Sequence, residues 1–179
     1  MRKEAAGEDI RIVGANQASW ADLEAVLGSV KCHGNLCYCQ RFKILERDWR
    51  RVSDDERAHL LREQTDCGHP RSKHTSGLVA FLGDGTPAAW CAVEPRSAYS
   101  HLRNTAWVGR REDRGDSRVW AVTCFVVRLE YRRRGITYLL ARRVPGSEPA
   151  QQAPGGDAGR ACRSGGPIAG PKGLARARR

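Results

Sequence analysis

The sequence predicts an α/β fold, and three observations carry this prediction. Apolar segments with the period of strands alternate with segments that have the caps and the period of helices. Turn residues separate these segments up to about residue 143. The most apolar strand pattern, residues 119–127, runs directly into a basic loop and a further helical pattern. The 179 residues are about one domain's worth, and no apolar run approaches the roughly 18 residues of a membrane-spanning helix.

The first predicted elements are a strand and a capped helix. Residues 10–13 (IRIV) alternate with polar neighbours, which is typical of a short strand. Asn16 or Ser19 is placed to cap a helix over residues 20–27, because either side chain can accept a hydrogen bond from a backbone N–H of the first turn. Gly28 is the expected stop signal of this helix.

A second helix is predicted from a capping box. Ser53 and Glu56 have the Ser-x-x-Glu spacing in which each side chain bonds an otherwise unpaired backbone N–H. We therefore expect a helix from this box to about Gln64. Residues 32–49, which precede it, have a looser pattern in which Phe42 to Trp49 form a weak helical face.

A hairpin and an apolar strand complete the predicted sheet. Residues 78–82 and 88–93 are apolar and the turn GDGT joins them, which is the signature of a β-hairpin. Charged and turn residues over 96–118 predict a loop with a short helical piece. Residues 119–127 (VWAVTCFVV) are apolar on both faces, so we expect a strand in the centre of the sheet, with Trp120 buried.

The composition changes after about residue 143. Residues 142–179 contain 8 Gly and 5 Pro, and their sizeable aliphatic residues are Val144, Ile168 and Leu174. Such a segment buries too little apolar surface to offset the roughly 1–2 kcal/mol per residue that ordering costs. We expect a domain over 1–143 and a disordered Gly/Pro/Ala/Arg-rich tail over 144–179. The abrupt break within a helical pattern leads to the hypothesis that a frameshift near codon 144 replaced the natural C-terminal part.

The net charge of +11 is divided unevenly along the chain. Residues 1–141 hold 23 Lys and Arg against 18 Asp and Glu, whereas residues 142–179 hold 8 against 2. The body is therefore only mildly basic, which suits an anionic small ligand. The tail lacks aromatic residues for base stacking, so we do not expect nucleic acid as the partner. Seven cysteines, and no apolar stretch after the basic start, predict a cytoplasmic protein with reduced thiols and no membrane association.

The strongest functional signal is the junction between the apolar strand and the helical pattern that follows it. An Arg-Arg-Arg-Gly loop over 132–135 precedes a helix that we expect to begin near Tyr138. The first N–H groups of a helix lack intrahelical acceptors and the helix dipole adds partial positive charge, so such a junction favours anions. Gly135 allows close approach of the backbone to a ligand, and the arginines add fixed charge. These residues alone predict a phosphate-containing ligand, with no reaction specified.

Residues 119–140 resemble the cofactor-binding segment of the GNAT superfamily of N-acetyltransferases. In that family an Arg/Gln-x-x-Gly-x-Gly/Ala motif follows the central strand, and here the motif is Arg132-x-x-Gly135-x-Thr137, with Thr where Gly or Ala is usual. The resemblance extends more weakly over residues 8–143. It implies a GNAT-like mixed sheet with flanking helices, from which the C-terminal strands of the family are missing after residue 143.

The resemblance also implies a ligand and a set of site residues. In the family, the loop amides hold the pyrophosphate of acetyl-CoA and the exposed backbone of the strand pairs with the pantetheine arm. It therefore implies acetyl-CoA as acyl donor and an amine, in a small molecule or a protein, as acceptor, with no metal. The implied cofactor-binding residues are Phe125, Val126, Val127, Arg132, Arg133, Arg134, Gly135, Ile136 and Thr137.

Direct attack on a thioester requires an unprotonated amine, so a base near the acceptor favours the reaction. Glu94 and Glu130 are the carboxylates that the predicted topology places nearest, and we name Glu94 as the catalytic residue. Tyr99 and His101 lie in the loop that would border the acceptor. The elements that often provide the general acid in the family have no counterpart after residue 143. A CoA-binding protein without catalysis therefore stays open as an alternative.

A zinc site in a basic-tailed nucleic-acid-binding protein is the other alternative. Several cysteines and histidines are of the types that bind structural zinc: Cys32, His33, Cys37, Cys39, Cys67, His69 and His74. Their spacings, C-x4-C and C-x-C, differ from the C-x2–4-C pairs that recur in structural zinc sites. Buried thiols explain the cysteines, and in a GNAT-like frame Cys37, Tyr38 and Gln40 would instead contact the acceptor.

Overall fold

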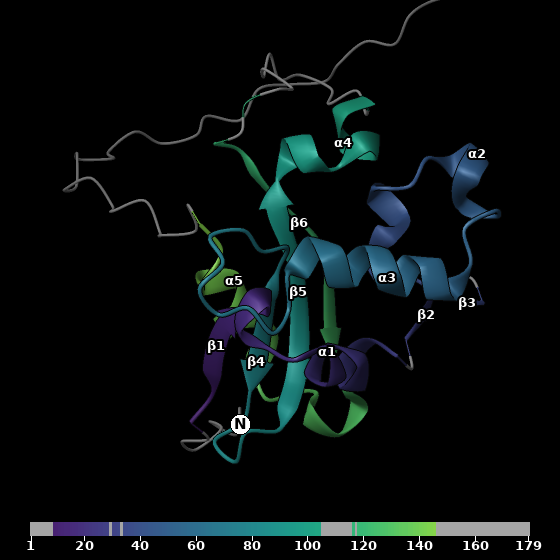
Figure 1. The fold of residues 1–179 in the computed structure, drawn as a ribbon. Helices are drawn as coiled ribbons and strands as arrows, with labels where there is room; N and C mark the ends of the chain where they lie inside the picture. Colours follow the sequence, from purple (N-terminus) through teal and green to yellow (C-terminus); the bar gives the residue numbers. More distant parts are fainter. Residues whose placement is uncertain (1–8, 29, 33, 105–115, 117, 146–179) are drawn as a thin grey trace, which may run out of the picture. The chain divides into compact units, whose positions relative to one another are not determined.

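The computed structural model describes residues 9–28, 30–32, 34–104, 116 and 118–145 as an α/β fold (Figure 1). They lie in the first of two units of the chain, 1–148 and 149–179. A four-stranded sheet has the order β1-β4-β5-β6, formed by Arg11–Gly14, Leu78–Phe81, Pro87–Pro95 and Trp120–Val127. A separate ribbon pairs β2 (Lys31–Cys32) with β3 (Asn35–Leu36). The helices are α1 (Trp20–Leu27), α2 (Glu46–Trp49), α3 (Asp54–Thr65), α4 (Ser100–Asn104) and α5 (Ile136–Arg142).

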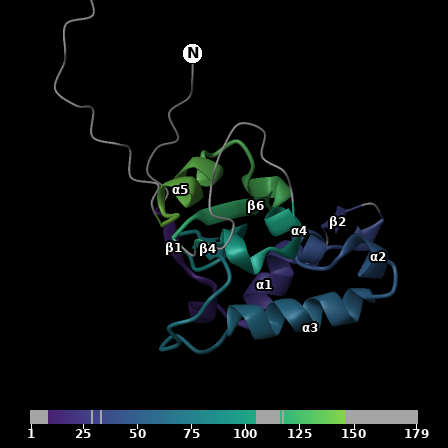
Figure 2. The ribbon, with the colours of Figure 1, turned by 90° about the horizontal axis from the view of Figure 1, so that it is seen from above.

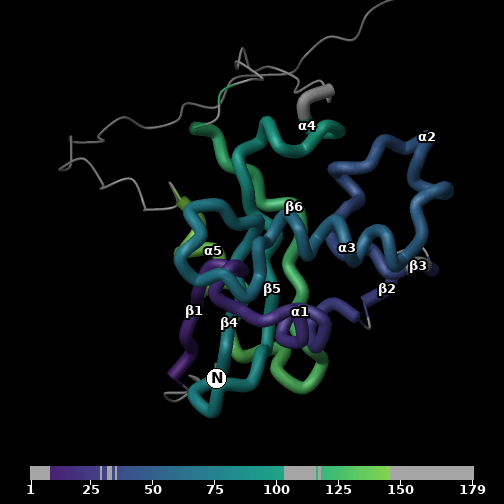
Figure 3. The backbone as a smooth tube through the Cα atoms, in the orientation of Figure 1, coloured from purple at the N-terminus to yellow at the C-terminus, as the bar shows by residue number. Residues whose placement is uncertain are grey.

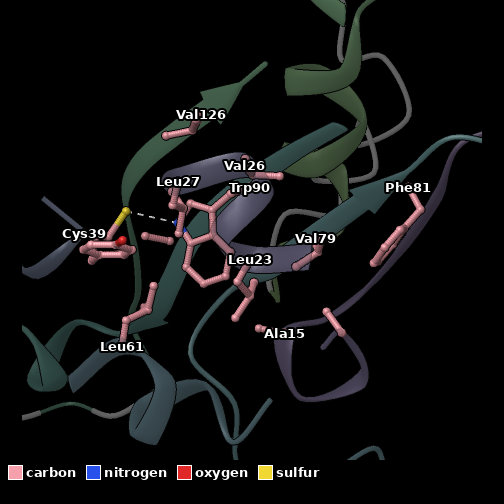
Figure 4. Close-up of a cluster of buried hydrophobic side chains, with 13 residues drawn as sticks. Ala15, Leu23, Val26, Leu27, Cys39, Leu61, Val79, Phe81, Trp90 and Val126 are labelled. Carbon is pink, nitrogen blue, oxygen red and sulfur yellow. Dashed lines mark hydrogen bonds between the residues drawn. The ribbon is translucent and has the colours of Figure 1, made fainter. Parts of the chain in front are cut away.

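Both faces of the sheet are covered, because successive side chains of a strand point to opposite faces. On one face Val79 and Trp90 pack with Leu23 and Val26 of α1 and with Leu61 of α3 (Figure 4). On the other face α5 covers β4 and β5, and its Ile136 and Leu140 are 2% and 0% exposed. The view along the sheet shows α1 and α3 on one side and α5 on the other (Figure 2).

The two helices predicted from their caps begin and end close to where the sequence indicates. In α1 the Ser19 hydroxyl accepts from the Asp22 N–H, and the Asp22 carboxylate accepts from the Ser19 N–H at 2.9 Å. In α3 Ser53 and Glu56 form the same reciprocal box. The first strand, the β4–β5 hairpin and the last strand are also confirmed within a residue or two.

The position of β6 in the sheet corrects one prediction. In the described part of the chain β6 pairs only with β5, so it is an edge strand and not a central one. Trp120, Val122 and Phe125 are 39%, 40% and 38% exposed, whereas burial was expected of Trp120. An apolar pattern on both faces predicts that both faces are covered, but it contains no information about which strand lies beyond the edge.

The pairing and the last helix differ from expectation in two further details. All pairings among the described strands are antiparallel, so the parallel contacts of the expected mixed sheet are not seen there. Helix α5 begins at Ile136, two residues before Tyr138, after a turn over 129–131 (Figure 3). Of the predicted loop, residues 96–104 form a short turn and α4, and residues 105–115 lie outside the described part. The predicted tail lies outside it from residue 146 onward.

Among the described residues, no helix has the length and apolarity that crossing a membrane requires.

Candidate functional site

A pocket of about 430 Å³ lies where β6 turns into α5. Its walls come from the end of β6, from the loop before α5, from the first turn of α5, and from one residue after α1. The lining residues are Val30, Phe125, Val126, Val127, Tyr131, Arg132, Arg133, Gly135, Ile136, Thr137 and Tyr138. The structure thus brings all of the sequence-predicted cofactor-binding residues except Arg134 to the wall of one pocket.

The loop of this pocket is fixed at both ends. After β6 ends, the Arg128 N–H donates to the Ala88 carbonyl at 3.0 Å, which continues the contact with β5. The Arg132 guanidinium then donates from Nε to the Val127 carbonyl at 3.1 Å and closes the turn over 129–131. On the far side, buried Ile136 holds the start of α5 against the sheet. The pocket wall is therefore tied to the sheet before and after the arginine-rich loop.

Two residues of the loop have left-handed backbone, and this explains the glycine of the motif. Arg133 has φ +64° and Gly135 has φ +77°. A Cβ built on Gly135 would have nothing within 4 Å, so its conformation and not a shortage of space requires glycine.

Helix α5 begins directly after Gly135, and the first N–H groups of a helix lack intrahelical acceptors. The first intrahelical bonds of α5 run from the N–H groups of Tyr138 and Leu139 to the Gly135 carbonyl, at 3.0 and 3.3 Å. Ile136 and Thr137 line the pocket, and their N–H groups precede these bonds in the helix. A ligand in the pocket can therefore meet backbone donors beside arginine side chains.

The three consecutive arginines have different environments. Arg132 and Arg133 line the pocket, and both are exposed. Arg134 instead donates from Nη2 to the Glu130 carbonyl at 3.3 Å, and its guanidinium lies 5.3 Å from the ring centre of Tyr131. The sequence predicted one role for all three, but the turn directs them to different surroundings.

The strand edge beside the pocket is open in the described part of the chain. Phe125, Val126 and Val127 line the pocket, and β6 has no strand neighbour there on the side away from β5. The pairing with β5 contains an irregularity between Ala92 and Val93, where Thr123 is an extra residue of β6. The pocket thus continues into a strand edge whose backbone groups can pair with an extended ligand.

Glu94, the predicted catalytic base, lies away from this pocket. It pairs with Ala121 across the β5–β6 ladder, four residues before Phe125 in β6, which is about 13 Å along the strand. Its carboxylate lies 2.7 Å from the ammonium group of Lys43, and the two side chains are 11% and 12% exposed. Lys43 also donates to Gln64 Oε1 at 2.7 Å and to Ser76 Oγ at 3.1 Å. Glu94 therefore belongs to a buried polar cluster.

The other residues expected near an acceptor lie in three different environments. Tyr99 is fully buried against the Lys43 cluster, with the ammonium group 5.5 Å from its ring centre, and burial raises the pKa of its phenol well above the usual range. His101 is half-buried in α4. Glu130 is exposed and pairs with Arg128 at 2.7 Å. Of these, only Glu130 stands in the turn next to the pocket.

The zinc candidates that the structure describes are not gathered at one place. In the part of the chain that the structure covers, no group of three or more Cys, His, Asp or Glu residues has the arrangement of a metal site. Cys37 and Cys39 are buried in or near the core, whereas His69 pairs with Asp66 at 2.8 Å on the surface. His33 lies outside the described residues.

Sequence reasoning missed three lining residues, Val30, Tyr131 and Tyr138. The two tyrosines flank the Arg-x-x-Gly motif, so their proximity to it in the sequence was an available signal. Tyr138 is 77% exposed, so its aromatic ring is available to contact a ligand beside the basic loop. Val30 follows α1 and meets the pocket only through the packing of α1 on the sheet, which no local pattern contains.

Comparisons of the chain with models of protein families, with curated proteins and with solved structures find no match.

Proposed function

We propose that residues 9–145 form the acyl-CoA-binding part of a GNAT-type N-acetyltransferase. The observation that carries the proposal is that the residues of the Arg132-x-x-Gly135-x-Thr137 motif and the end of the preceding strand line one pocket. The strand, turn and helix of this junction follow one another in the order that the resemblance implies. The antiparallel order β1-β4-β5-β6, with helices on both faces, is compatible with a GNAT-like fold.

The chemistry of the pocket suits the two ends of an acyl-CoA donor. Arg132 and Arg133, with the N–H groups of Ile136 and Thr137, supply charged and neutral donors of the kind that bind pyrophosphate oxygens. The apolar residues Phe125 to Val127 and the open edge of β6 suit an extended amide-containing arm. In this arrangement the thioester end lies farther along β6, toward the extra residue Thr123.

The reaction proposed is direct transfer. The unprotonated amine nitrogen of the acceptor attacks the thioester carbonyl carbon, a C–N bond forms, and the C–S bond to CoA breaks. The attacking nitrogen loses one proton as the amide forms, and the leaving thiolate gains one. Pairing of Glu94 with Lys43 at 2.7 Å favours a structural role for Glu94, so the proton is not routed through its carboxylate in this scheme.

The ion pair between Glu94 and Lys43 favours a second candidate function, which is donor binding without transfer. The residues that line the pocket suit the acyl-CoA donor. The carboxylate of Glu94, the predicted base, instead forms an ion pair with Lys43. The two candidates share the donor site and differ in turnover. Release of free CoA thiol in the presence of an amine panel separates them, because a binding protein would bind acetyl-CoA without releasing thiol.

A pair of glycine variants tests the donor site. Gly135 and Gly85 have φ +77° and +85°, and a Cβ on either would have nothing within 4 Å. Gly135→Val and Gly85→Val therefore carry a similar backbone strain of about 1–2 kcal/mol. Only Gly135 lines the pocket. We expect Gly135→Val to abolish acetyl-CoA binding and Gly85→Val to retain it, and equal affinities in both folded variants would overturn the proposal.

A further inference from the structure

A groove between β1 and α5 lies at the other edge of the sheet from the pocket between β6 and α5. β1 and β6 are the two ends of the strand order. The groove has a volume of about 360 Å³ and is lined by Ile10, Ile12, Leu139, Arg142 and Arg143. Both ribbon views show α5 beside β1 (Figure 1, Figure 2). We call the space between these residues the β1–α5 groove, and it shares no lining residue with the pocket at β6.

The register of β1 directs the backbone groups of every second residue away from β4. In an antiparallel pair, residues that exchange ladder bonds alternate with residues that do not. The Ala15 N–H donates to the Gly77 carbonyl at 3.1 Å, and two residues earlier in the same register Val13 faces Val79. The alternation therefore gives the ladder bonds to Val13 and turns the N–H and carbonyl of Ile12 outward. In the part of the chain that the structure describes, β1 has no strand neighbour on this outer side.

The side chains of the groove combine an apolar floor with positive charge. Ile10 and Ile12 are partly buried and pack against the core cluster that contains Ile136 and Leu140 of α5, so the floor is held in place by the fold. Arg142 and Arg143 are exposed, and no acidic residue is among those that line the groove. The groove thus presents outward backbone groups, apolar side chains and two guanidinium groups within one hollow.

We propose that the β1–α5 groove binds an extended acidic segment of a partner protein, which adds a strand to β1. A peptide that joins a sheet edge gains main-chain hydrogen bonds, and its alternate side chains enter the adjoining groove. Here an apolar side chain packs on Ile10, Ile12 and Leu139. Carboxylates at the next alternate positions of the peptide pair with the guanidinium groups of Arg142 and Arg143.

Charge determines which occupant fits. Guanidinium groups without an acidic neighbour in the groove attract Asp and Glu and repel basic segments. The chain's own residues 146–179 hold 6 Lys and Arg against 2 Asp and Glu, so they match the groove poorly. A second copy of the chain, with its net charge of +11, is repelled in the same way. The occupant is therefore an acidic segment from another protein, and this proposal does not rest on the acetyltransferase assignment.

Fluorescence anisotropy of the full chain with a labelled, end-blocked peptide provides the test. The peptide Ser-Ile-Thr-Glu-Thr-Glu-Ser places one Ile and two Glu on one face of a strand. We expect saturable binding at low ionic strength, and binding at least about tenfold weaker when both Glu are replaced by Lys. Absence of binding to the folded chain, or equal affinities of the Glu and Lys peptides, would overturn the proposal.

Two N-methylated forms of the Glu peptide test strand addition. One form is methylated at the Ile and both Glu, and the other at both Thr and the last Ser, so charge and composition are the same. In a strand pair the N–H groups of alternate residues face the partner strand. One form should therefore bind at least about tenfold more weakly than the other. Equal affinities would show that charge alone attracts the peptide and would contradict strand addition.

Charge reversal in the chain locates the site. Arg142→Glu/Arg143→Glu should weaken binding of the Glu peptide at least about tenfold and strengthen binding of the Lys peptide, a switch that an unfolded variant cannot produce. The matched control Arg50→Glu/Arg51→Glu makes the same change of charge at exposed positions after α2, outside the groove. It should change both affinities by less than about threefold. Equal effects of the two double variants would exclude the β1–α5 groove as the binding site.

Discussion

The carboxylate of Glu94 and the ammonium group of Lys43 lie 2.7 Å apart with little exposure to solvent. Glu94 stands near the end of β5, whereas Lys43 follows the helical turn over 40–42. Lys43 also donates to Gln64 of α3 and to Ser76. One ammonium group thus joins the sheet, α3 and the segment between them, which explains why a charged residue is tolerated at the otherwise apolar β5.

Breaking this pair from one side should destabilise the fold. Lys43→Met leaves the Glu94 carboxylate buried without its cation, and we expect a loss of about 3–5 kcal/mol in the free energy of unfolding. Urea denaturation measures the loss. The double variant Lys43→Met/Glu94→Met removes both charges and should be more stable than the single variant. A single variant within about 0.5 kcal/mol of the parent chain would contradict the role assigned to the pair.

Glu94 should also be dispensable for donor binding. Because its side chain belongs to the Lys43 cluster and does not line the pocket, Glu94→Gln should leave the acetyl-CoA dissociation constant within about twofold of the parent value, which is about 0.4 kcal/mol. Calorimetry on the folded variant provides the measurement. A loss of affinity of tenfold or more at unchanged stability would place Glu94 in the donor site after all.

A positive charge in the pocket wall should contribute more to acetyl-CoA binding than a positive charge elsewhere on the surface. Arg133 lines the pocket, whereas Arg142 lies on α5 outside it, and both side chains are exposed. We expect Arg133→Ala to weaken acetyl-CoA binding about five- to tenfold, or about 1–1.4 kcal/mol, and the difference to shrink at high salt. Arg142→Ala removes the same charge and should change the affinity by less than twofold. Equal losses would indicate a general charge effect.

A single buried arginine should contribute strongly to stability. Arg57 is 2% exposed, donates to the carbonyls of Leu36 and Val52, and pairs with Asp54. Arg57→Ala leaves these partly buried acceptors without their donor and removes a buried side chain, so we expect a loss of about 3 kcal/mol. The exposed pair of Arg51 with Asp48 provides the control, and Arg51→Ala should cost less than about 0.5 kcal/mol. Chemical unfolding of both variants gives the comparison.

The capping box of α3 predicts a dependence of stability on pH. The backbone N–H and the hydroxyl of Ser53 donate to the Glu56 carboxylate and lower the pKa of Glu56 below 4.5. A lowered folded-state pKa gives stability that is present above the unfolded-state value and is lost as pH falls through the folded value. The parent chain should therefore be more stable than Glu56→Gln at neutral pH. This difference should shrink as unfolding is measured at pH values below 4.5, and a constant difference would contradict the account.

Local signals in the sequence predicted the elements that depend on neighbouring residues. The boxes at Ser19 and Ser53 predicted the starts of α1 and α3, because a capping box is complete within four residues. The turn GDGT predicted the β4–β5 hairpin for the same reason. The adjacency of residues 125–127 and 132–137 in the pocket also follows from a short strand–turn–helix connection.

Features set by distant contacts could not be predicted in the same way. The partner of Glu94 is Lys43, and nothing in the pattern around either residue indicates the other. Exposure of Trp120 depends on whether a neighbour pairs with β6, which the composition of β6 does not reveal. Arg134 differs from Arg132 and Arg133 because of the left-handed backbone at Arg133, which sequence reasoning does not assign to arginine.

Calorimetric titration of the full chain with acetyl-CoA, and with CoA as a comparison, tests whether the pocket between β6 and α5 binds an acyl-CoA donor. We expect saturable binding at one site per chain for both ligands, because both contain the pyrophosphate and the pantetheine arm. Binding should be lost in Gly135→Val and retained in Gly85→Val. The absence of binding to a folded chain, at ligand concentrations that saturate ordinary acyl-CoA sites, would contradict the assignment of the pocket between β6 and α5.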